Sequence, residues 1–348
     1  MQPNFTLKKI GSFLRPMPML FILCCLFAGK INAQQFINGN LSTGSPNSVG
    51  VAAPAGFTWS EMQAGANTIG AGANSAAGLS LADNFTIGCG NWTVNKVTVF
   101  AYSTGFVGTV SPFTDIRIAI YNTNPNTNPA PIFGDRTTNR FLASSTASMY
   151  RVTPGASATT RQIWKIEAAI PALVLNPGNY WIEFSVGGPA SNFCPPSTVL
   201  GTTTQPGNNA QQRANTGVWT ALVDAGPQDM PFIVDYTATP CAGTPVPGNT
   251  IASTASACAG INFNLSLQNC TPGAGIAYQW QRATAVGGPY TNIPGATGIT
   301  LAISQAAATF YRSNVSCGAN IGTSTPVQVL LNAPSNCYCA PSYTNGCS

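Results

Sequence analysis

The sequence contains no histidine, and only nine of its 348 residues are acidic. Histidine is the side chain that most often transfers protons near neutral pH and most often binds metal ions. A serine hydrolase of the usual kind is excluded, because no imidazole is present to deprotonate the hydroxyl. The few acidic residues leave little material for catalysis by carboxylates. The composition therefore predicts a protein that is not an enzyme and that uses no cofactor.

Charged residues make up 7% of the chain, whereas about a quarter is usual for a globular protein. Disorder is one interpretation of so little charge combined with 35 glycines and 27 prolines. The 44% hydrophobic content argues against it. Short apolar runs separated by Gly, Pro and Asn predict strands and turns, and no segment has the periodicity of an amphipathic helix. The expected fold class is all-β.

The N-terminus has the pattern of a secretory signal peptide. Basic residues precede an apolar run over 17–29, and Ala33 provides a small residue at the cleavage position. The run is too short for a membrane span of about 20 residues. We predict that residues 1–33 are removed and that the mature chain is secreted, extracellular or on the cell surface. Without them, 10 basic and 9 acidic residues remain, so we expect neither nucleic-acid binding nor a membrane span in the mature chain.

Apolar and polar residues alternate along several segments of the first half, among them 116–121, 161–170 and 180–186. This period of two is typical of half-buried antiparallel strands. A change of phase near Asn95 indicates a β-bulge. We expect a jelly-roll-like β-sandwich over 79–238. The preceding residues, 34–78, are turn-rich and predict an arm or a first edge strand followed by a low-complexity loop.

A Pro/Gly linker is expected over 239–250, followed by a second module over 251–333. The second module resembles bacterial Ig-like domains. The motifs that carry the resemblance are Cys258-Ala-Gly, Phe263-Asn-Leu265, Tyr278-Gln-Trp280-Gln, Ile293-Pro-Gly-Ala296 and Phe310-Tyr311. It implies an Ig-like sandwich in which Trp280 is the core tryptophan and Tyr311 is the corner tyrosine. Leu265 and Ser313 stand where such domains have their inter-sheet disulfide, so that bridge is missing.

Other segments resemble parts of secreted multimodular bacterial surface proteins. LADNFTI, SPFTDIRIAIYN and NPGNYWIEF are similar to an uncharacterised β-sandwich region of such proteins. The ending CYCAPSYTNGCS resembles the start of a Cys-rich repeat of the GEVED type. We therefore interpret 334–348 as the first part of a truncated further domain.

Nine cysteines follow the signal peptide, and an exported chain is expected to oxidise them. We predict three disulfides, with the pairs Cys270–Cys317, Cys241–Cys258 and Cys89–Cys194. Cys337 and Cys339 lack the spacing and the second pair of a zinc site, so no metal site is expected. The odd number of cysteines agrees with a truncated last domain.

Binding is the function that the residues best support. Trp181 and Glu183 share a parity opposite to the core residues of their strand, and Arg117 and Asp235 have similar off-core positions. An aromatic ring beside a carboxylate is suited to a sugar, whose C–H groups stack on the ring. The expected partner is an extracellular glycan or another surface protein. In the alternative interpretation Trp181 packs beneath a loop or against a second layer. The alternative function for the chain is a purely structural spacer that displays downstream domains.

A glycoside hydrolase or lyase is a third, weaker hypothesis. Such an enzyme needs two carboxyl groups on either side of the scissile bond. Glu167 and Glu183 would supply them if their strands were neighbours in one sheet. Ordinary solvated carboxylates on a sheet surface are the more common explanation for such residues.

Overall fold

A computed structural model describes residues 33–63, 65–106, 108–198 and 209–337 of the chain. The predicted signal peptide, apart from Ala33, and two cysteines of the predicted truncated domain, Cys339 and Cys347, lie outside these residues. The regular secondary structure of the described chain is almost entirely β, with two short 3₁₀ turns, η1 (Pro125–Thr127) and η2 (Pro334–Asn336). Within the described ranges, no helix has the length and hydropathy needed to cross a bilayer.

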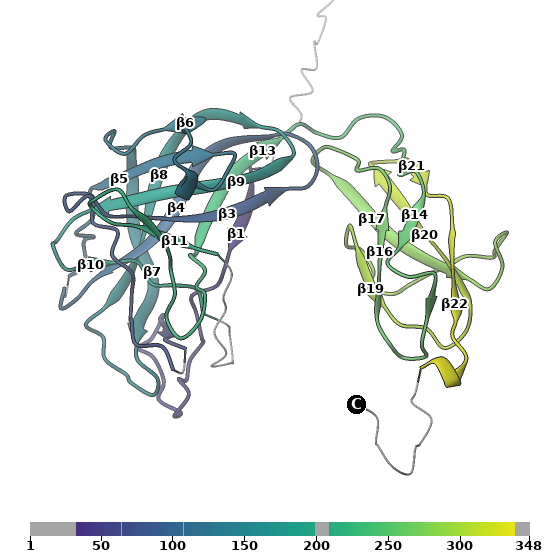
Figure 1. Cartoon of the computed structure of the whole chain (residues 1–348), viewed down its shortest axis with the longest axis horizontal. Coiled ribbons are helices and arrows are strands. Elements are labelled where there is room, and N and C mark those ends of the chain that lie inside the picture. Colours follow the sequence, from purple (N-terminus) through teal and green to yellow (C-terminus); the bar gives the residue numbers. More distant parts are fainter. Residues whose placement is uncertain (1–32, 64, 107, 199–208, 338–348) are drawn as a thin grey trace, which may run out of the picture. The chain divides into compact units, whose positions relative to one another are not determined.

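The first module is a sandwich of two mainly antiparallel sheets (Figure 1). The first sheet contains, in spatial order, β1 (Ala33–Asn38), β13 (Phe232–Ala238), β4 (Trp92–Ser103), β8 (Gln162–Leu175), β7 (Phe141–Val152) and β2 (Thr58–Glu61), with β10 (Asn192–Phe193) paired to β4. The second sheet contains β12 (Trp219–Ala221), β11 (Gln211–Arg213), β3 (Ser80–Ile87), β9 (Gly178–Gly187), β5 (Asp115–Tyr121) and β6 (Phe133–Gly134).

The order of these strands confirms the jelly-roll prediction. From β3 to β5 the chain changes sheet at every strand. It changes sheet again from β8 to β9, and β13 lies once more in the first sheet. The resulting rows β1-β13-β4-β8 and β3-β9-β5-β6 are the two four-stranded sheets of a jelly roll. The additional strands β2 and β7 extend the first sheet, and β11 and β12 extend the second.

The alternating pattern read from the sequence places the core between the two sheets. Ile116, Ile118 and Ile120 of β5 lie beside Ile182 and Phe184 of the neighbouring strand β9. All five are buried in one apolar cluster that also contains residues of β4 and β8 in the other sheet. The expected bulge is also confirmed, because the pairing of β4 with β8 shifts register between Val94 and Lys96.

The first part of the segment before the sandwich belongs to it, so the interpretation of residues 34–60 as an arm is wrong and the edge-strand alternative is right. β1 pairs with β13 along its whole length, and β2 pairs in parallel with β7. These two strands form the opposite edges of the first sheet. Trp59 of β2 is 1% exposed, and its indole donates to Val51 O at 2.9 Å, which fixes the turn-rich segment to the sheet.

The second module is a smaller sandwich with the strand order of an Ig-like fold. One sheet contains β14 (Thr250–Ala252), β16 (Phe263–Leu267) and β19 (Leu301–Ile303). The other contains β15 (Ser256–Ala257), β22 (Val327–Leu331), β20 (Thr309–Cys317), β17 (Ile276–Ala283) and β18 (Thr291–Asn292), with β21 (Asn320–Thr323) paired to β20. β15 and β22 pair in parallel, as the first and last strands of many Ig-like domains do.

Trp280 and Tyr311 occupy the core positions expected for them. Trp280 is fully buried and its indole donates to Gly298 O at 2.9 Å. The Tyr311 hydroxyl donates to Gln305 Oε1 at 3.2 Å, six residues upstream, in the manner of a tyrosine corner. The fold class predicted from the sequence is therefore confirmed for both modules.

The predicted disulfide pairs are wrong, although the cysteines do form disulfides. The observed pairs are Cys89–Cys270, Cys241–Cys317 and Cys258–Cys337, and Cys194 is a free, buried thiol. Cys89 precedes the start of β4, whereas Cys194 lies beside the last residues of β4. Because β4 is 12 residues long, about 35 Å separate the two ends, far more than a disulfide spans.

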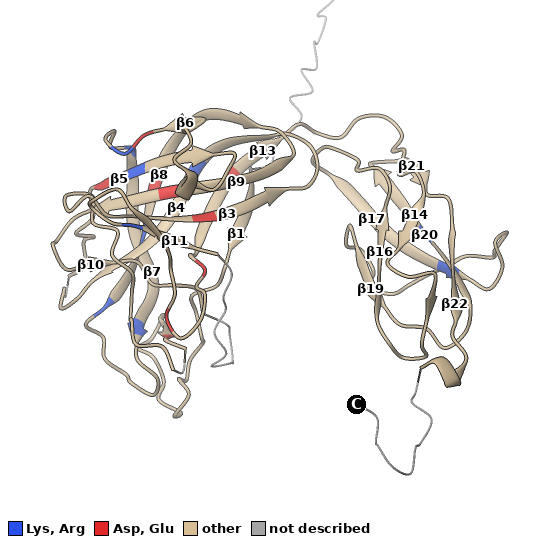
Figure 2. Ribbon diagram, in the orientation of Figure 1, with Lys and Arg blue, Asp and Glu red and all other residues tan. Residues whose placement is uncertain are grey.

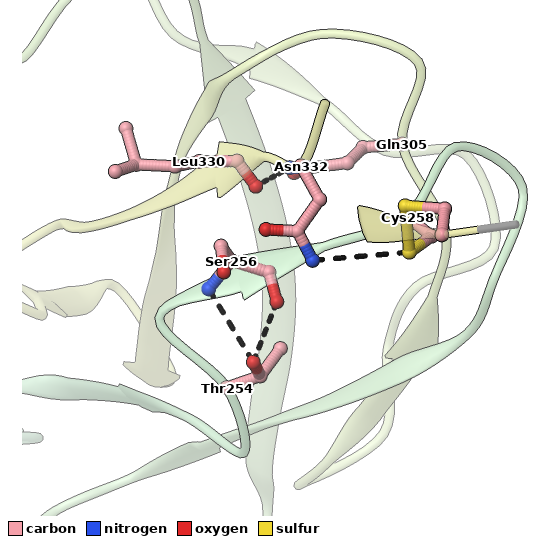
Figure 3. The surroundings of a disulfide bond; sticks show 7 residues. Thr254, Ser256, Cys258, Gln305, Leu330 and Asn332 are labelled. Atoms are coloured by element: carbon pink, nitrogen blue, oxygen red, sulfur yellow. Dashed lines mark hydrogen bonds between the residues drawn. A yellow bond between two sulfur atoms is a disulfide. The ribbon is translucent and has the colours of Figure 1, made fainter. Parts of the chain in front are cut away.

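The pairs in the second module follow from its strand directions. Parallel strands end at the same edge of a sheet, so Cys258 after β15 meets Cys337 after β22 (Figure 3). The Asn332 side chain lies beside this bridge, with Nδ2 3.8 Å from Cys258 Sγ. Cys241 lies against the connection between β16 and β17, where its backbone N–H donates to Ala274 O, and this places it at the end of β20 next to Cys317.

Candidate functional site

The outward face of the second sheet of the jelly roll carries most of the predicted site. The core residues of β9 face the first sheet, so Trp181 and Glu183 face outward as predicted. Trp181 is nevertheless only 7% exposed, because it packs with Ala82, Tyr121 and Trp219 in a small cluster on this face. The prediction of Trp181 as an open aromatic platform is therefore wrong, and the alternative, a tryptophan packed beneath a further layer, is right.

Glu183 is a buried carboxylate that accepts three hydrogen bonds. Ser80 Oγ and Arg136 Nε donate to Oε1 at 2.6 and 2.7 Å, and the Tyr121 hydroxyl donates to Oε2 at 2.6 Å. Burial, together with the neighbouring Glu183 carboxylate, raises the pKa of Tyr121, which keeps this phenol protonated. A carboxylate whose hydrogen bonds are satisfied in this way links the segments that provide the donors.

Arg117 lies on the same face but is already neutralised. Its NH2 group lies 3.1 Å from Asp115 Oδ2, and its NH1 group donates to the carbonyl oxygen of Arg136 at 3.2 Å. The side chain therefore joins β5 to the loop after β6 rather than presenting a free charge.

The structure does not bring Asp235 to this site. Asp235 lies on β13 of the opposite sheet, where Gln35 Nε2 donates to Oδ1 at 2.7 Å and Lys96 Nζ lies 3.6 Å from Oδ2. Because the two sheets of a sandwich turn their outer faces in opposite directions, Asp235 and Trp181 lie on opposite sides of the module.

The division of the strands between two sheets also separates Glu167 and Glu183, the two carboxyl groups that the hydrolase hypothesis requires to be close together. Glu167 lies on β8 of the first sheet, with Oε1 2.7 Å from Lys96 Nζ, and Glu183 lies on β9 of the second sheet. The turn at Asn176-Pro177-Gly178 carries the chain from one sheet to the other instead of forming a hairpin within one sheet. The two carboxylates therefore face away from each other across the core.

Another acidic pair, which the sequence did not reveal, lies at the seam between the sheets. Asp83 of β3 is fully buried and accepts hydrogen bonds from the backbone N–H groups of Met230 and Asn84 at 2.5 and 2.7 Å. Burial first, and then a hydrogen bond with Asp229 and its charge, raise the pKa of Asp83 to about 9. The pair is therefore held together by a retained proton.

A small cavity opens beside the Glu183 cluster. It has a volume of about 40 Å³, and the side chains around it include Ser80, Ser185, Arg136 and Arg213. Arg136 is partly exposed there, with 42% of its side chain accessible. Arg213 of β11 and Trp219 of β12 are directly opposite each other in the sheet. Sequence reasoning missed these residues because the loop with Arg136 and the short strands β11 and β12 show little periodicity.

Comparison with known proteins gives one family match and one slight structural likeness. Residues 247–333 match a family described as "Domain of unknown function (DUF8696)", which covers the Ig-like module. No curated protein matches the chain. A crystal structure of a protein described as membrane-anchored, from Corynebacterium diphtheriae, aligns with 8% identity and a TM-score of 0.18, over 74% of this chain and 52% of that one. The chain thus spans about half the length of that protein, and a likeness this slight carries no functional argument.

Proposed function

We propose that the chain is a non-catalytic structural part of an exported surface or matrix protein, and that its disulfides limit how far it extends under load. The observation that carries this proposal is the set of three disulfides, which overlap in sequence between residues 89 and 337. The predicted signal peptide supports export, since disulfides persist in oxidising compartments.

The outward polar groups also support a structural role over catalysis. Glu183 is fully engaged by its donors, and Glu167 is held by Lys96. The Ig-like module has only two charged residues between 250 and 333, Arg282 and Arg312. The charged residues are concentrated on the jelly roll (Figure 2).

The test is to stretch single molecules of the full chain between its ends, with and without a reductant. The shortest covalent path from Ala33 to Cys337 runs through Cys89–Cys270 and Cys258–Cys337. It contains about 70 residues, so complete unfolding of the oxidised chain extends it by at most ~250 Å. The reduced chain has about 300 residues between the same points, and its extension approaches ~1,000 Å.

Two outcomes would contradict the proposal. One is an oxidised chain that extends as far as the reduced chain, because the disulfides would then not limit extension. The other is turnover of a polysaccharide by the purified protein that is lost in the variant Glu167→Gln. Glu167 is a suitable probe because its ion pair is partly exposed, so its replacement leaves the fold intact.

A further inference from the structure

The cavity beside Glu183 lies on a row of polar residues that crosses three strands. Arg213 of β11 is opposite Ser80 of β3. Leu81 is opposite Phe184, so the antiparallel register places Ser80 opposite Ser185 of β9. One guanidinium and two hydroxyls thus stand side by side on the outer face, and the Arg136 side chain borders the same cavity.

Positive charge exceeds negative charge around this cavity. Arg136 is balanced by Glu183 at 2.7 Å, and the nearby Arg117 is balanced by Asp115. Arg213 has no acidic partner within the described chain, and its NH1 group makes a 3.4 Å hydrogen bond with Gly78 O. The cavity therefore has one uncompensated guanidinium beside it, that of Arg213. A second guanidinium, that of Arg136, donates from Nε to Glu183 and from NH2 to the Tyr121 hydroxyl at 3.2 Å, which leaves its NH1 group for a ligand.

The size of the cavity fits a small anionic group. A volume of about 40 Å³ corresponds to roughly three positions for a water molecule. A carboxylate or a sulfate ester has about this size. The donors present are those that recognise such groups best, because a guanidinium presents several N–H groups in one plane to two oxygens.

An aromatic ring stands next to the charged row. Trp219 is directly opposite Arg213, is half-buried against Trp181, and has an indole N–H that is buried without a hydrogen-bond partner. A tryptophan ring stacks on the C–H groups of a sugar. Ring and guanidinium together suit a sugar that carries an anionic group.

We propose that this cavity binds the carboxylate or sulfate group of an acidic polysaccharide, with Arg213 and Arg136 holding the anion and Trp219 in contact with the sugar ring. The proposal goes beyond the structural role above and does not depend on it. It also replaces Trp181 by Trp219 as the residue that contacts the ligand.

The test is affinity electrophoresis of the folded full chain in gels that contain polygalacturonate, dextran sulfate, neutral dextran or polyglutamate. We expect retardation by polygalacturonate if the site takes carboxylates, by dextran sulfate if it takes sulfate esters, and none by dextran. The variant Arg213→Gln should weaken binding at least tenfold. Ser185→Val, which fills the cavity without changing the charge, should weaken it to a similar extent.

Arg282→Gln is the matched control, because it removes the same charge at an exposed position of the Ig-like module. Its binding should equal that of the unmodified chain, and melting curves should show that all variants fold. The proposal is overturned if neither acidic polysaccharide is retained, or if Arg282→Gln weakens binding as much as Arg213→Gln. Equal retardation by polyglutamate would also overturn it, because the site would then recognise charge without a sugar.

Discussion

The two modules reach a stable β-sandwich by different means. The jelly roll has a large apolar core between its sheets and contains all nine acidic residues of the chain. The Ig-like module has a much smaller core around Trp280 and Leu265. Its two disulfides are Cys258–Cys337, after the paired strands β15 and β22, and Cys241–Cys317, at the end of β20. One module thus depends on buried area and buried polar contacts, and the other on covalent cross-links.

This difference agrees with the scaling of buried surface with size. A small domain buries a smaller fraction of its surface than a large one, so its apolar core alone leaves it marginally stable. Cross-links compensate by lowering the entropy of the unfolded chain. The larger module can instead tolerate a free thiol, Cys194, in the middle of its core.

The largest expected effect is the loss of a disulfide from the Ig-like module. In the double variant Cys258→Ser and Cys337→Ser, the unfolded chain regains the freedom of a 79-residue loop. The expected loss in the free energy of unfolding is ~4 kcal/mol. Hydrogen exchange of the amides of β17 and of β4 measures the free energy of unfolding separately in each module. Exchange should accelerate strongly in β17 and hardly in β4.

Cys194→Ala provides the comparison in the jelly roll. It removes a buried sulfur from a large core and should cost about 1 kcal/mol, seen in β4 and absent from β17. If the two variants destabilise their modules equally, the contrast between a cross-linked module and a core-stabilised module is wrong.

The second expected effect is a dependence of the jelly roll's stability on pH. The folded state keeps a proton on Asp83, whose pKa is about 9, whereas the unfolded chain releases it near the ordinary value of 3.8. The folded state therefore binds more protons between these limits, and stability falls as pH rises from about 4 to about 9. The slope is at most ~1.4 kcal/mol per pH unit.

The variant Asp83→Asn should remove most of this slope and raise the melting temperature at pH 8. The amide still accepts the N–H of Met230, and it needs no proton from the solution. Asp224→Asn, at a carboxylate nearer the surface that accepts two backbone N–H groups, should keep the slope of the unmodified chain. An unmodified chain with no slope between pH 5 and 8 would show that the Asp83–Asp229 pair is not protonated.

Much of the fold could be predicted from local pattern. The alternation in β5 and β9 identified the core face of each strand, and Trp280 and Tyr311 marked the Ig-like module. The pairing of cysteines could not be predicted in this way. It depends on which strand ends share an edge, and β15 is only two residues long, too short to give a periodic signal.

The candidate site could be predicted only in part, because alternation along a strand gives the face of a residue and not its neighbours from other segments. Parity placed Trp181 and Glu183 on the outer face correctly, but it does not report what covers a residue. The cover comes from Trp219 and Arg136, which are 38 residues after Trp181 and 47 residues before Glu183. Asp235 was grouped with the others because parity does not say to which of the two sheets a strand belongs.

The smallest expected effect is the loss of stability when one carboxylate is neutralised on each outer face of the jelly roll. Glu183→Gln removes the charge from a buried network with three donors and should cost about 2 kcal/mol, because hydrogen bonds to charged groups are the stronger ones. Glu167→Gln breaks an ion pair whose side chains are 24% and 27% exposed, so it should cost less than 1 kcal/mol. Urea unfolding in low and high salt separates the two variants. The cost of Glu167→Gln should shrink in salt and that of Glu183→Gln should remain, because the Glu167 side chain is 24% exposed whereas that of Glu183 is 2% exposed. Equal costs with equal salt dependence would mean that the covering layer over Glu183 is open in solution, and that Trp181 beneath it is open as well.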